Sequence, residues 1–203
     1  MSRRTSAKQL RRRVGVRPEY RTVVVFTEGK ETECDYISAL MKLPSVANDT
    51  ALSIDIDPGH GIDPLTLVRH AAERLQSSEV DECWCVFDVE WPQHHAHLEE
   101  ARALASQKNV KLAISNPCFE LWLILHSQLQ SAFIDTGAAQ QLCKALDKHQ
   151  GKSINASEYM PKIPAAVKNA ETLQKWHERN GTVFPDDNPS SGMAEFVRAI
   201  GAI

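Results

Sequence analysis

VVVFTEG, residues 23–29, is a run of β-branched and aromatic residues that ends in an acid and a glycine. A strand that is apolar at every position is buried on both faces, as in a parallel sheet that is covered by helices. The run WCVFD, residues 84–88, has the same character. These two stretches predict an α/β domain built on a mostly parallel central sheet.

Strand and helix patterns alternate around these two runs. Strands are predicted at residues 22–27, 52–57, 83–88 and 110–115, and helices between them at 31–42, 64–76 and 95–107. The remainder is predicted to be helical, at 117–129, 138–149, 165–179 and 191–200, with loops at 151–164 and 180–192, which are rich in Pro, Gly, Asn and Ser. The predicted fold is therefore a sheet flanked by helices, followed by a helical C-terminal portion.

The length of 203 residues suits one domain better than two. We assign residues 1–20 to a basic N-terminal arm and residues 21–203 to the domain. Residues 1–13 carry six Arg or Lys and no acid, although the whole chain has a net charge of -3. Such an arm either binds a polyanion such as nucleic acid or is a solvated tail, and the sequence leaves both readings open.

Composition indicates a globular cytoplasmic protein. Hydrophobic residues make up 42% of the chain and charged residues 24%, and no apolar run approaches the roughly 20 residues that span a bilayer. The N-terminus lacks the apolar segment of a secretory signal, and we expect no membrane association. The five cysteines form no CxxC pair and are expected to be buried free thiols: Cys34, Cys83, Cys85, Cys118 and Cys143.

Acidic residues follow several of the predicted strands. Glu28 comes after the first strand, and Asp88 and Glu90 close the third. The carboxyl ends of parallel strands meet at one edge of a sheet, where carboxylates repel one another unless a cation lies between them. Oxygen ligands favour Mg²⁺ or Mn²⁺, so these three are our candidate catalytic residues and metal ligands. Alternatively, they are merely solvated or cap the next helix, a role that we assign to Glu31 and Glu33.

A second set of polar residues follows the fourth strand. We expect Asn116 to cap a helix that begins at Pro117, which would place Glu120 near the positive end of that helix and beside Asp88. Glu120 is therefore either part of the site or a charge that the helix end tolerates. Together with Gly29 after the first strand, Asn116 and Glu120 are predicted substrate contacts.

Phosphate contacts are predicted further along the chain. Lys162, in YMPK, could contact a phosphate through its ammonium group, and we count it among the catalytic candidates. Ser190 and Ser191 precede the last predicted helix, whose first amides could bind the same group. For all three, the alternative is an ordinary solvated or capping residue.

Several histidines lie near these segments without a decided role. His94, His95 and His97 follow the acidic pair and could act as a general base or ligand, or simply begin a helix. The loop PGHG around His60 could approach a phosphate, but the chain contains no GxxxxGK[ST] motif. We therefore do not expect this chain to hydrolyse ATP by itself.

Four motifs in this order resemble the RloB-like proteins, whose domain is similar to the TOPRIM fold. They are VVVFTEGKETECDYISAL (23–40), WCVFDVEW (84–91), SNPCFELWLILH (115–126) and NPSSGMAEFV (188–197). The resemblance covers roughly residues 20–200. It implies that Glu28 matches the TOPRIM glutamate and that Asp88 matches the first Asp of the DxD pair. Glu90 stands in place of the second Asp, and it would reach a metal ion directly or through water.

The resemblance implies a metal-dependent nuclease that hydrolyses DNA or RNA, with tRNA among the candidate substrates. Such a protein would act as an effector in anti-phage defence and abortive infection, beside an ATPase partner subunit. The alternative is a non-catalytic TOPRIM-like subunit that binds nucleic acid or an ATPase. A small-molecule phosphotransferase is disfavoured because no nucleotide-binding loop is present. Whether the protein forms a homo-oligomer is left open by the sequence.

Overall fold

The computed structural model describes residues 20–59, 61–147 and 154–203. The predicted basic arm, apart from Tyr20, lies outside these residues, and so does His60. The described chain forms one sheet in the order β2-β1-β3-β4-β5, in which only β5 is antiparallel to its neighbour. The strands are β1 (Arg21–Thr27), β2 (Leu52–Pro58), β3 (Glu82–Asp88), β4 (Lys111–Asn116) and β5 (Ser190–Ser191). The prediction of a mostly parallel central sheet is confirmed.

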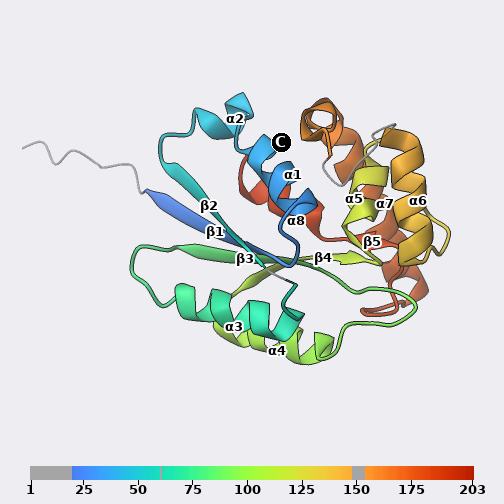
Figure 1. Cartoon of the computed structure of the whole chain (residues 1–203), viewed down its shortest axis with the longest axis horizontal. Coiled ribbons are helices and arrows are strands. Elements are labelled where there is room, and N and C mark those ends of the chain that lie inside the picture. The colour runs from blue at the N-terminus through green and yellow to red at the C-terminus, as the bar shows by residue number, and fades with distance from the viewer. Residues whose placement is uncertain (1–19, 60, 148–153) are drawn as a thin grey trace, which may run out of the picture.

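Helices cover both faces of the sheet (Figure 1). One face carries α3 (Pro64–Arg74) and α4 (Leu98–Lys108). The opposite face carries the remaining helices, with the helical C-terminal portion gathered beside β4 and β5. These are α1 (Thr32–Leu40), α2 (Pro44–Ala47), α5 (Phe119–Leu125), α6 (Thr136–Asp147), α7 (Ile163–Asn180) and α8 (Met193–Ala199), with the short 3-10 turns η1 (Ala156–Glu158) and η2 (Met160–Lys162) before α7.

The side chains of β1 are divided between two hydrophobic cores. Val23 and Val25 pack with α1 and the C-terminal helices, whereas Val24 and Phe26 pack with α3 and α4. This division follows from the period of two along a strand. A continuous apolar run is therefore needed here, because both faces of β1 are buried.

A buried hydrogen-bonded chain ties α1 to α5. The Nδ1 atom of His126 lies 2.8 Å from the carbonyl oxygen of Trp122, and Nε2 lies 2.9 Å from the hydroxyl of Tyr36. A carbonyl oxygen only accepts, so Nδ1 carries the proton and Nε2 accepts from Tyr36. Burial lowers the pKa of His126 to about 4, which keeps the ring neutral.

Some predicted boundaries were wrong. The helix predicted at 117–129 is the shorter α5, and its last predicted residues form a loop. The end of the loop predicted at 151–164 contains η1, η2 and the start of α7, while 151–153 lie outside the described residues. The strand β5 occupies the end of the loop predicted at 180–192. Pro161 and Pro164 in first-turn positions explain the earlier start of ordered turns.

The first strand and the last helix meet. The Nη1 atom of Arg21 donates to the carbonyl oxygen of Ala199 at 2.8 Å, and Nη2 lies 2.7 Å from Glu82 Oε1. This contact joins β1, β3 and α8 at the edge of the sheet where the parallel strands begin.

The cysteine prediction holds with one correction. All five cysteines are free, and four of them are buried, but Cys34 is partly exposed, with its Sγ 3.3 Å from Thr27 Oγ1. Within the part of the chain that the structure describes, no helix is long and apolar enough to cross a membrane.

Candidate active site

The candidate site lies at the edge of the sheet where the parallel strands end. β1 ends at Thr27, β3 at Asp88 and β4 at Asn116. The register pairs Thr27 with Val86 and Asp88 with Ser115. Residues that follow neighbouring strands are consequently brought side by side, as the sequence predicted.

Glu28 contacts the next strand through both its backbone and its carboxylate. Its N–H donates to the carbonyl oxygen of Val86 at 3.0 Å, and its Oε2 accepts from the N–H of Asp88 at 3.3 Å. Its Oε1 lies 2.9 Å from Nε2 of His95. The contact with Glu28 raises the pKa of His95, which favours the ion pair. Glu28 is thus fixed between β3 and the loop that follows it.

Asp88 is the most strongly perturbed acid of the site. Its Oδ1 is buried and has no hydrogen-bond partner among the described residues. Burial raises the pKa of Asp88 well above its ordinary value, and the charges of Glu33, Glu28, Glu120 and Glu90 raise it further, in that order. Asp88 as a whole is partly exposed, but leaving one carboxylate oxygen buried and unpaired is costly, so this position favours a proton or a cation.

Glu33 belongs to this cluster, although the sequence had assigned it to helix capping. It lies in the first turn of α1 and is only 9% exposed. A Cβ atom at Gly29 would come within 2.5 Å of Glu33 Oε2, so the glycine leaves the space that this carboxylate fills. Burial and then the charges of Glu120 and Glu28 raise the pKa of Glu33, although nearby backbone N–H groups oppose the shift.

The capping prediction was wrong for Glu31 and incomplete for Glu33, whose carboxylate lies in the first turn of α1 near backbone N–H groups but also belongs to the cluster. Glu31 occupies the N-cap position of α1, but no side chain caps that helix. The signal that could have revealed Glu33 is its spacing from Glu28 in EGKETE, since a strand end and the first turn of the next helix face the same edge.

Glu120 also joins the cluster. It lies in the first turn of α5, and its charge contributes to the raised pKa values of Asp88 and Glu33. Of the two roles that the sequence left open for Glu120, this influence on Asp88 favours membership of the site.

The expected capping of α5 by Asn116 was wrong. The helix begins at Phe119 with Cys118 at its N-cap position, and no side chain caps it. Asn116 Nδ2 instead donates to the carbonyl oxygen of Pro185 at 2.8 Å and to Asp187 Oδ1 at 2.9 Å. Asn116 thus bonds to the loop that contains Pro185 and Asp187, and no local sequence pattern predicts that contact.

Glu90 is turned by an unusual backbone conformation. Its φ of 67° lies in the left-handed region, and its N–H donates to the carbonyl oxygen of Pro117 at 2.8 Å. Its Oε2 accepts from Thr136 Oγ1 at 2.8 Å, at the start of α6. The charge of Glu90 is the last of the four that act on Asp88. Glu90 therefore lies at the rim of the cluster, bound to α6.

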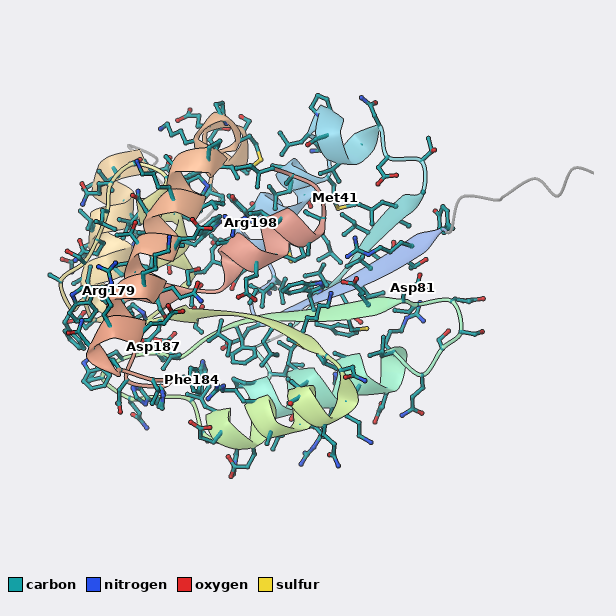
Figure 2. The ribbon with its side chains drawn as sticks, turned by 180° about the vertical axis from the view of Figure 1, so that it is seen from behind. Met41, Asp81, Arg179, Phe184, Asp187 and Arg198 are labelled. Atoms are coloured by element: carbon teal, nitrogen blue, oxygen red, sulfur yellow. The ribbon has the colours of Figure 1, made fainter. Side chains whose placement is uncertain are left out.

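Ser190 and Ser191 form β5 and do not begin a helix. Ser191 pairs with Ser115, and their hydroxyl oxygens are 3.3 Å apart. Both residues line a groove of about 670 Å³ between α7, α8 and the loop that carries Phe184 and Asp187. Figure 2 shows these two loop residues, seen from behind. The two serines therefore do not supply the first amides of α8, because that helix begins only at Met193.

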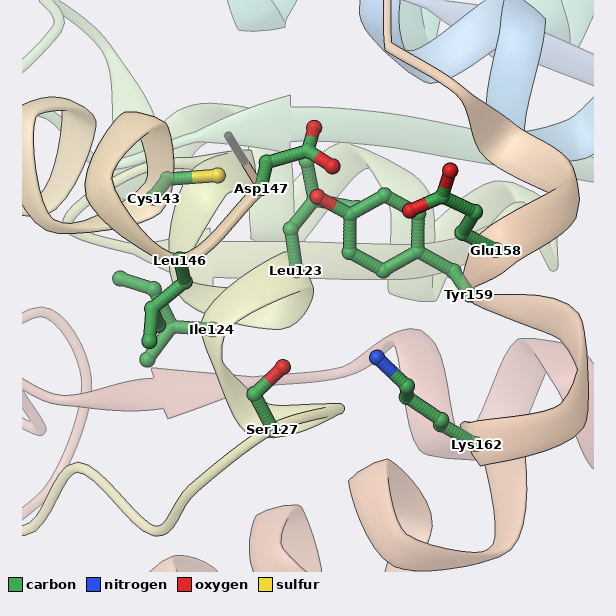
Figure 3. Close-up of a pocket in the computed structure, with 9 residues that line it drawn as sticks. All are labelled: Leu123, Ile124, Ser127, Cys143, Leu146, Asp147, Glu158, Tyr159 and Lys162. Carbon is green, nitrogen blue, oxygen red and sulfur yellow. The ribbon is translucent and has the colours of Figure 1, made fainter. Parts of the chain in front are cut away.

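Lys162 faces a different part of the molecule. It lies in η2 and lines a cavity of about 30 Å³, which has room for roughly one water molecule. Figure 3 shows Lys162 directed toward this cavity with Ser127 and Tyr159. Its charge acts on His126 and is not among the influences that shift the pKa of Asp88. The structure therefore does not bring Lys162 into the carboxylate cluster.

The three histidines after the acidic pair have separate positions. Only His95 contacts the cluster, through Glu28. The ring of His94 packs on Trp91 with centroids 5.0 Å apart, and Nδ1 of His97 lies 3.3 Å from Glu100 on the surface of α4.

The donor chemistry of the cluster fits a hard divalent cation. In the described residues, no three His, Cys, Asp or Glu side chains are arranged as a ready-made metal site. The side chains whose charges raise the pKa of Asp88 nevertheless offer only carboxylate oxygens, which suit Mg²⁺ or Mn²⁺, and Asp88 Oδ1 is buried without a partner among the described residues.

Comparison with known proteins adds one finding. A family model described as "RloB-like protein" matches residues 23–200. No curated protein and no solved structure matches the chain.

Proposed function

The chain belongs to the RloB-like protein family, and from this premise we propose that it is a nuclease that hydrolyses DNA or RNA with Mg²⁺ or Mn²⁺. The observation that carries the proposal is the buried, unpartnered Oδ1 of Asp88 within a cluster of carboxylates at the end of the parallel strands. The resemblance of the domain to TOPRIM proteins supports the same reaction.

Asp88 and Glu28 are the residues that would hold the cation, with Glu33 and Glu120 close to Asp88 and Glu90 at the rim. A bound divalent ion would polarise the scissile phosphoryl oxygen and lower the pKa of an attacking water molecule. His95 holds the Glu28 carboxylate in place through its Nε2 atom. A proton at His95 also offsets part of the negative charge that an approaching phosphate meets.

The biological setting is part of the same proposal. We place the protein in the cytoplasm as an effector of anti-phage defence, working with an ATPase partner. The lack of a GxxxxGK[ST] motif supports a separate ATPase subunit.

A second candidate is a non-catalytic subunit that binds nucleic acid or an ATPase. Two observations favour it: Glu90 stands where TOPRIM proteins have an Asp, and its Oε2 is already bonded to Thr136. In this case the carboxylates would be remnants of an ancestral site.

A cleavage assay separates the two candidates. The purified protein, alone and with an ATPase encoded beside it, is incubated with tRNA, plasmid and single-stranded DNA in Mg²⁺ or Mn²⁺. We expect the wild type to cleave at least one of these substrates, and we expect Asp88→Ala and Glu28→Ala each to abolish that cleavage. The matched control is Glu99→Ala, which removes an exposed carboxylate on α4. Cleavage that survives both site substitutions would contradict the assignment.

A thermal unfolding assay with MnCl₂ or MgCl₂ gives a readout that does not depend on activity. A ligand that binds only the folded state at 100 times its Kd adds about 2.7 kcal/mol to the free energy of unfolding. We expect the cation to stabilise the wild type and Glu99→Ala, and not Asp88→Asn. Equal stabilisation of all three would mean that the cation binds elsewhere.

A further inference from the structure

Two aromatic side chains beside the carboxylate cluster, Trp91 and Phe133, belong to neither hydrophobic core, although the ring of Trp91 also packs on His94. Trp91 follows Glu90 directly, and its ring meets Phe133 edge to face with centroids 5.1 Å apart. Phe133 is 57% exposed, and Trp91 is partly exposed. The neighbouring Ile134 is buried and supplies the apolar anchor of this segment, so the core does not require Phe133.

Hydrogen bonds fix this aromatic pair to the rim of the site. The N–H of Trp91 donates to Thr136 Oγ1 at 3.0 Å, and the same oxygen donates to Glu90 Oε2 at 2.8 Å. The N–H of Thr136 donates back to the carbonyl oxygen of Trp91 at 3.3 Å. One threonine thus joins the aromatic pair and the carboxylate rim into a single unit.

The segment that carries Phe133 is fixed from its other side. The N–H of Ile134 donates to Asn188 Oδ1 at 3.2 Å, and Asn188 Nδ2 donates to the carbonyl oxygen of Ile134 at 2.9 Å. An exposed ring on a backbone that is fixed in this way loses little freedom when it binds a flat partner.

The charge of the surroundings selects the kind of partner. Glu28, Glu33, Asp88, Glu90 and Glu120 all lie at this edge, so a phosphate backbone is repelled unless other contacts hold it. Stacking on an aromatic ring is available to every base and does not depend on charge. In a duplex, the faces of the bases are hidden by their neighbours, so only an unpaired base can stack on an external ring.

We propose that Trp91 and Phe133 form a stacking platform for an unpaired nucleobase, which makes single-stranded or flipped-out nucleic acid the substrate class of the adjacent site. This inference rests on the proposed nuclease function. The platform holds the base beside Glu90 at the rim, which leaves the neighbouring phosphate close to the cation that Asp88 would hold.

Binding in an inactive background tests the platform. Fluorescence anisotropy is measured on the full chain carrying Asp88→Asn, with labelled oligodeoxythymidylate, an abasic oligonucleotide of equal length and a hairpin duplex. The abasic strand carries the same backbone charge without bases. We expect the thymidylate to bind more tightly than the abasic strand, and Trp91→Ala or Phe133→Ala to weaken that binding by at least about fivefold. Duplex and abasic binding should not change.

Two further variants control for general damage. Trp176→Ala removes a ring that is 49% exposed on α7, a helix that does not carry the platform, and it should leave thymidylate binding unchanged. Trp91→Phe keeps an aromatic face and should retain most of the affinity. Thermal unfolding of each variant shows whether it is folded.

Two binding results would overturn the platform: equal affinity for the thymidylate and abasic strands, or equal losses of thymidylate affinity in Trp91→Ala and Trp176→Ala. A third contrary result would be a wild type that is a dimer by light scattering and a Phe133→Ala variant that is a monomer. The last would identify the aromatic pair as a contact between copies of the chain. A failure of the nuclease proposal looks different, because the wild type would then cleave no substrate whatever the anisotropy shows.

Discussion

Asp88 lies at a position where an ionised carboxylate destabilises the fold. Two like charges about 4 Å apart repel by roughly 4 kcal/mol at an effective dielectric near 20, and several acids surround this one. Residues placed for function often reduce stability in this way. The position of Asp88 was predictable from the end of its strand. The size of the perturbation of its pKa was not, because it includes the charges of Glu33 and Glu120, which come from two different helices.

Replacing Asp88 by Asn should stabilise the apo protein. The change removes a partly buried charge that neighbouring carboxylates repel, and it keeps the shape, so we expect a gain of roughly 0.5–2 kcal/mol in the free energy of unfolding at pH 7. The folded pKa of Asp88 lies above its unfolded value, so ionisation costs stability as the pH rises above about 4. The gain, measured by urea denaturation without divalent ions, should shrink as the pH falls toward 4. A gain that stays constant with pH would show that charge is not its cause.

His126 should make stability depend on pH in the opposite direction. It is 3% exposed, and burial lowers its pKa to about 4, below the ordinary value of 6.5. The unfolded chain therefore takes up a proton first, and stability falls as the pH drops from about 6.5 to 4, by an amount on the order of 3 kcal/mol.

Urea denaturation over this pH range checks the role of His126. The variant His126→Gln should be less stable at pH 7 and should lose most of this pH dependence. The matched control is His97→Gln, which changes an exposed histidine and should keep the wild-type slope. Identical slopes in the wild type and His126→Gln would contradict the assignment.

At the scale of elements, local patterns predicted the buried strands and the long amphipathic helices well. The apolar runs of β1 and β3 are buried on both faces, and α3 begins at Pro64, where the sequence placed it. Two of the errors, those at β5 and at Asn116, concern contacts with distant partners. β5 exists because it pairs with the end of β4, and Asn116 bonds a loop about seventy residues away. No local pattern contains those contacts.

The loop after β2 supports the end of β1 and should not tolerate a larger residue. Gly59 donates its N–H to the carbonyl oxygen of Thr27 at 2.7 Å, and a Cβ there would lie 2.1 Å from the same oxygen. Gly59→Ala must therefore displace the backbone at Thr27 and Glu28, and we expect a loss of about 1–3 kcal/mol in stability, measured by urea denaturation.

Gly137→Ala is the matched control for this change. A Cβ at Gly137 would make only an ordinary contact with Asp135 at 3.4 Å, and alanine is the better helix former in α6. We expect this variant to be neutral or slightly more stable. If both alanine variants lost the same stability, close approach at Gly59 would not be the reason.

At the scale of the whole molecule, charge is distributed very unevenly. Residues 1–13 contribute six positive charges, and the net charge of the chain is -3. If the arm binds nucleic acid, deleting residues 1–13 should weaken binding and reduce the slope of log K against log salt by up to about 5 for duplex DNA. Anisotropy titrations over a range of salt concentrations measure this slope. An unchanged slope would make the arm a passive tail, and an arm replaced by an equally long Gly-Ser sequence controls for length.

The hydrogen bond between Arg21 and Ala199 places the two ends of the folded domain side by side. Glu28 lies at the other end of the first strand, roughly 20 Å away at 3.3 Å per residue. Segments fused at either end would leave from one side of the domain and remain clear of the carboxylates. The same proximity makes the domain suitable for circular permutation: a short linker could join the two ends, and a new opening in the turn at residues 76–79 would leave every strand pairing intact.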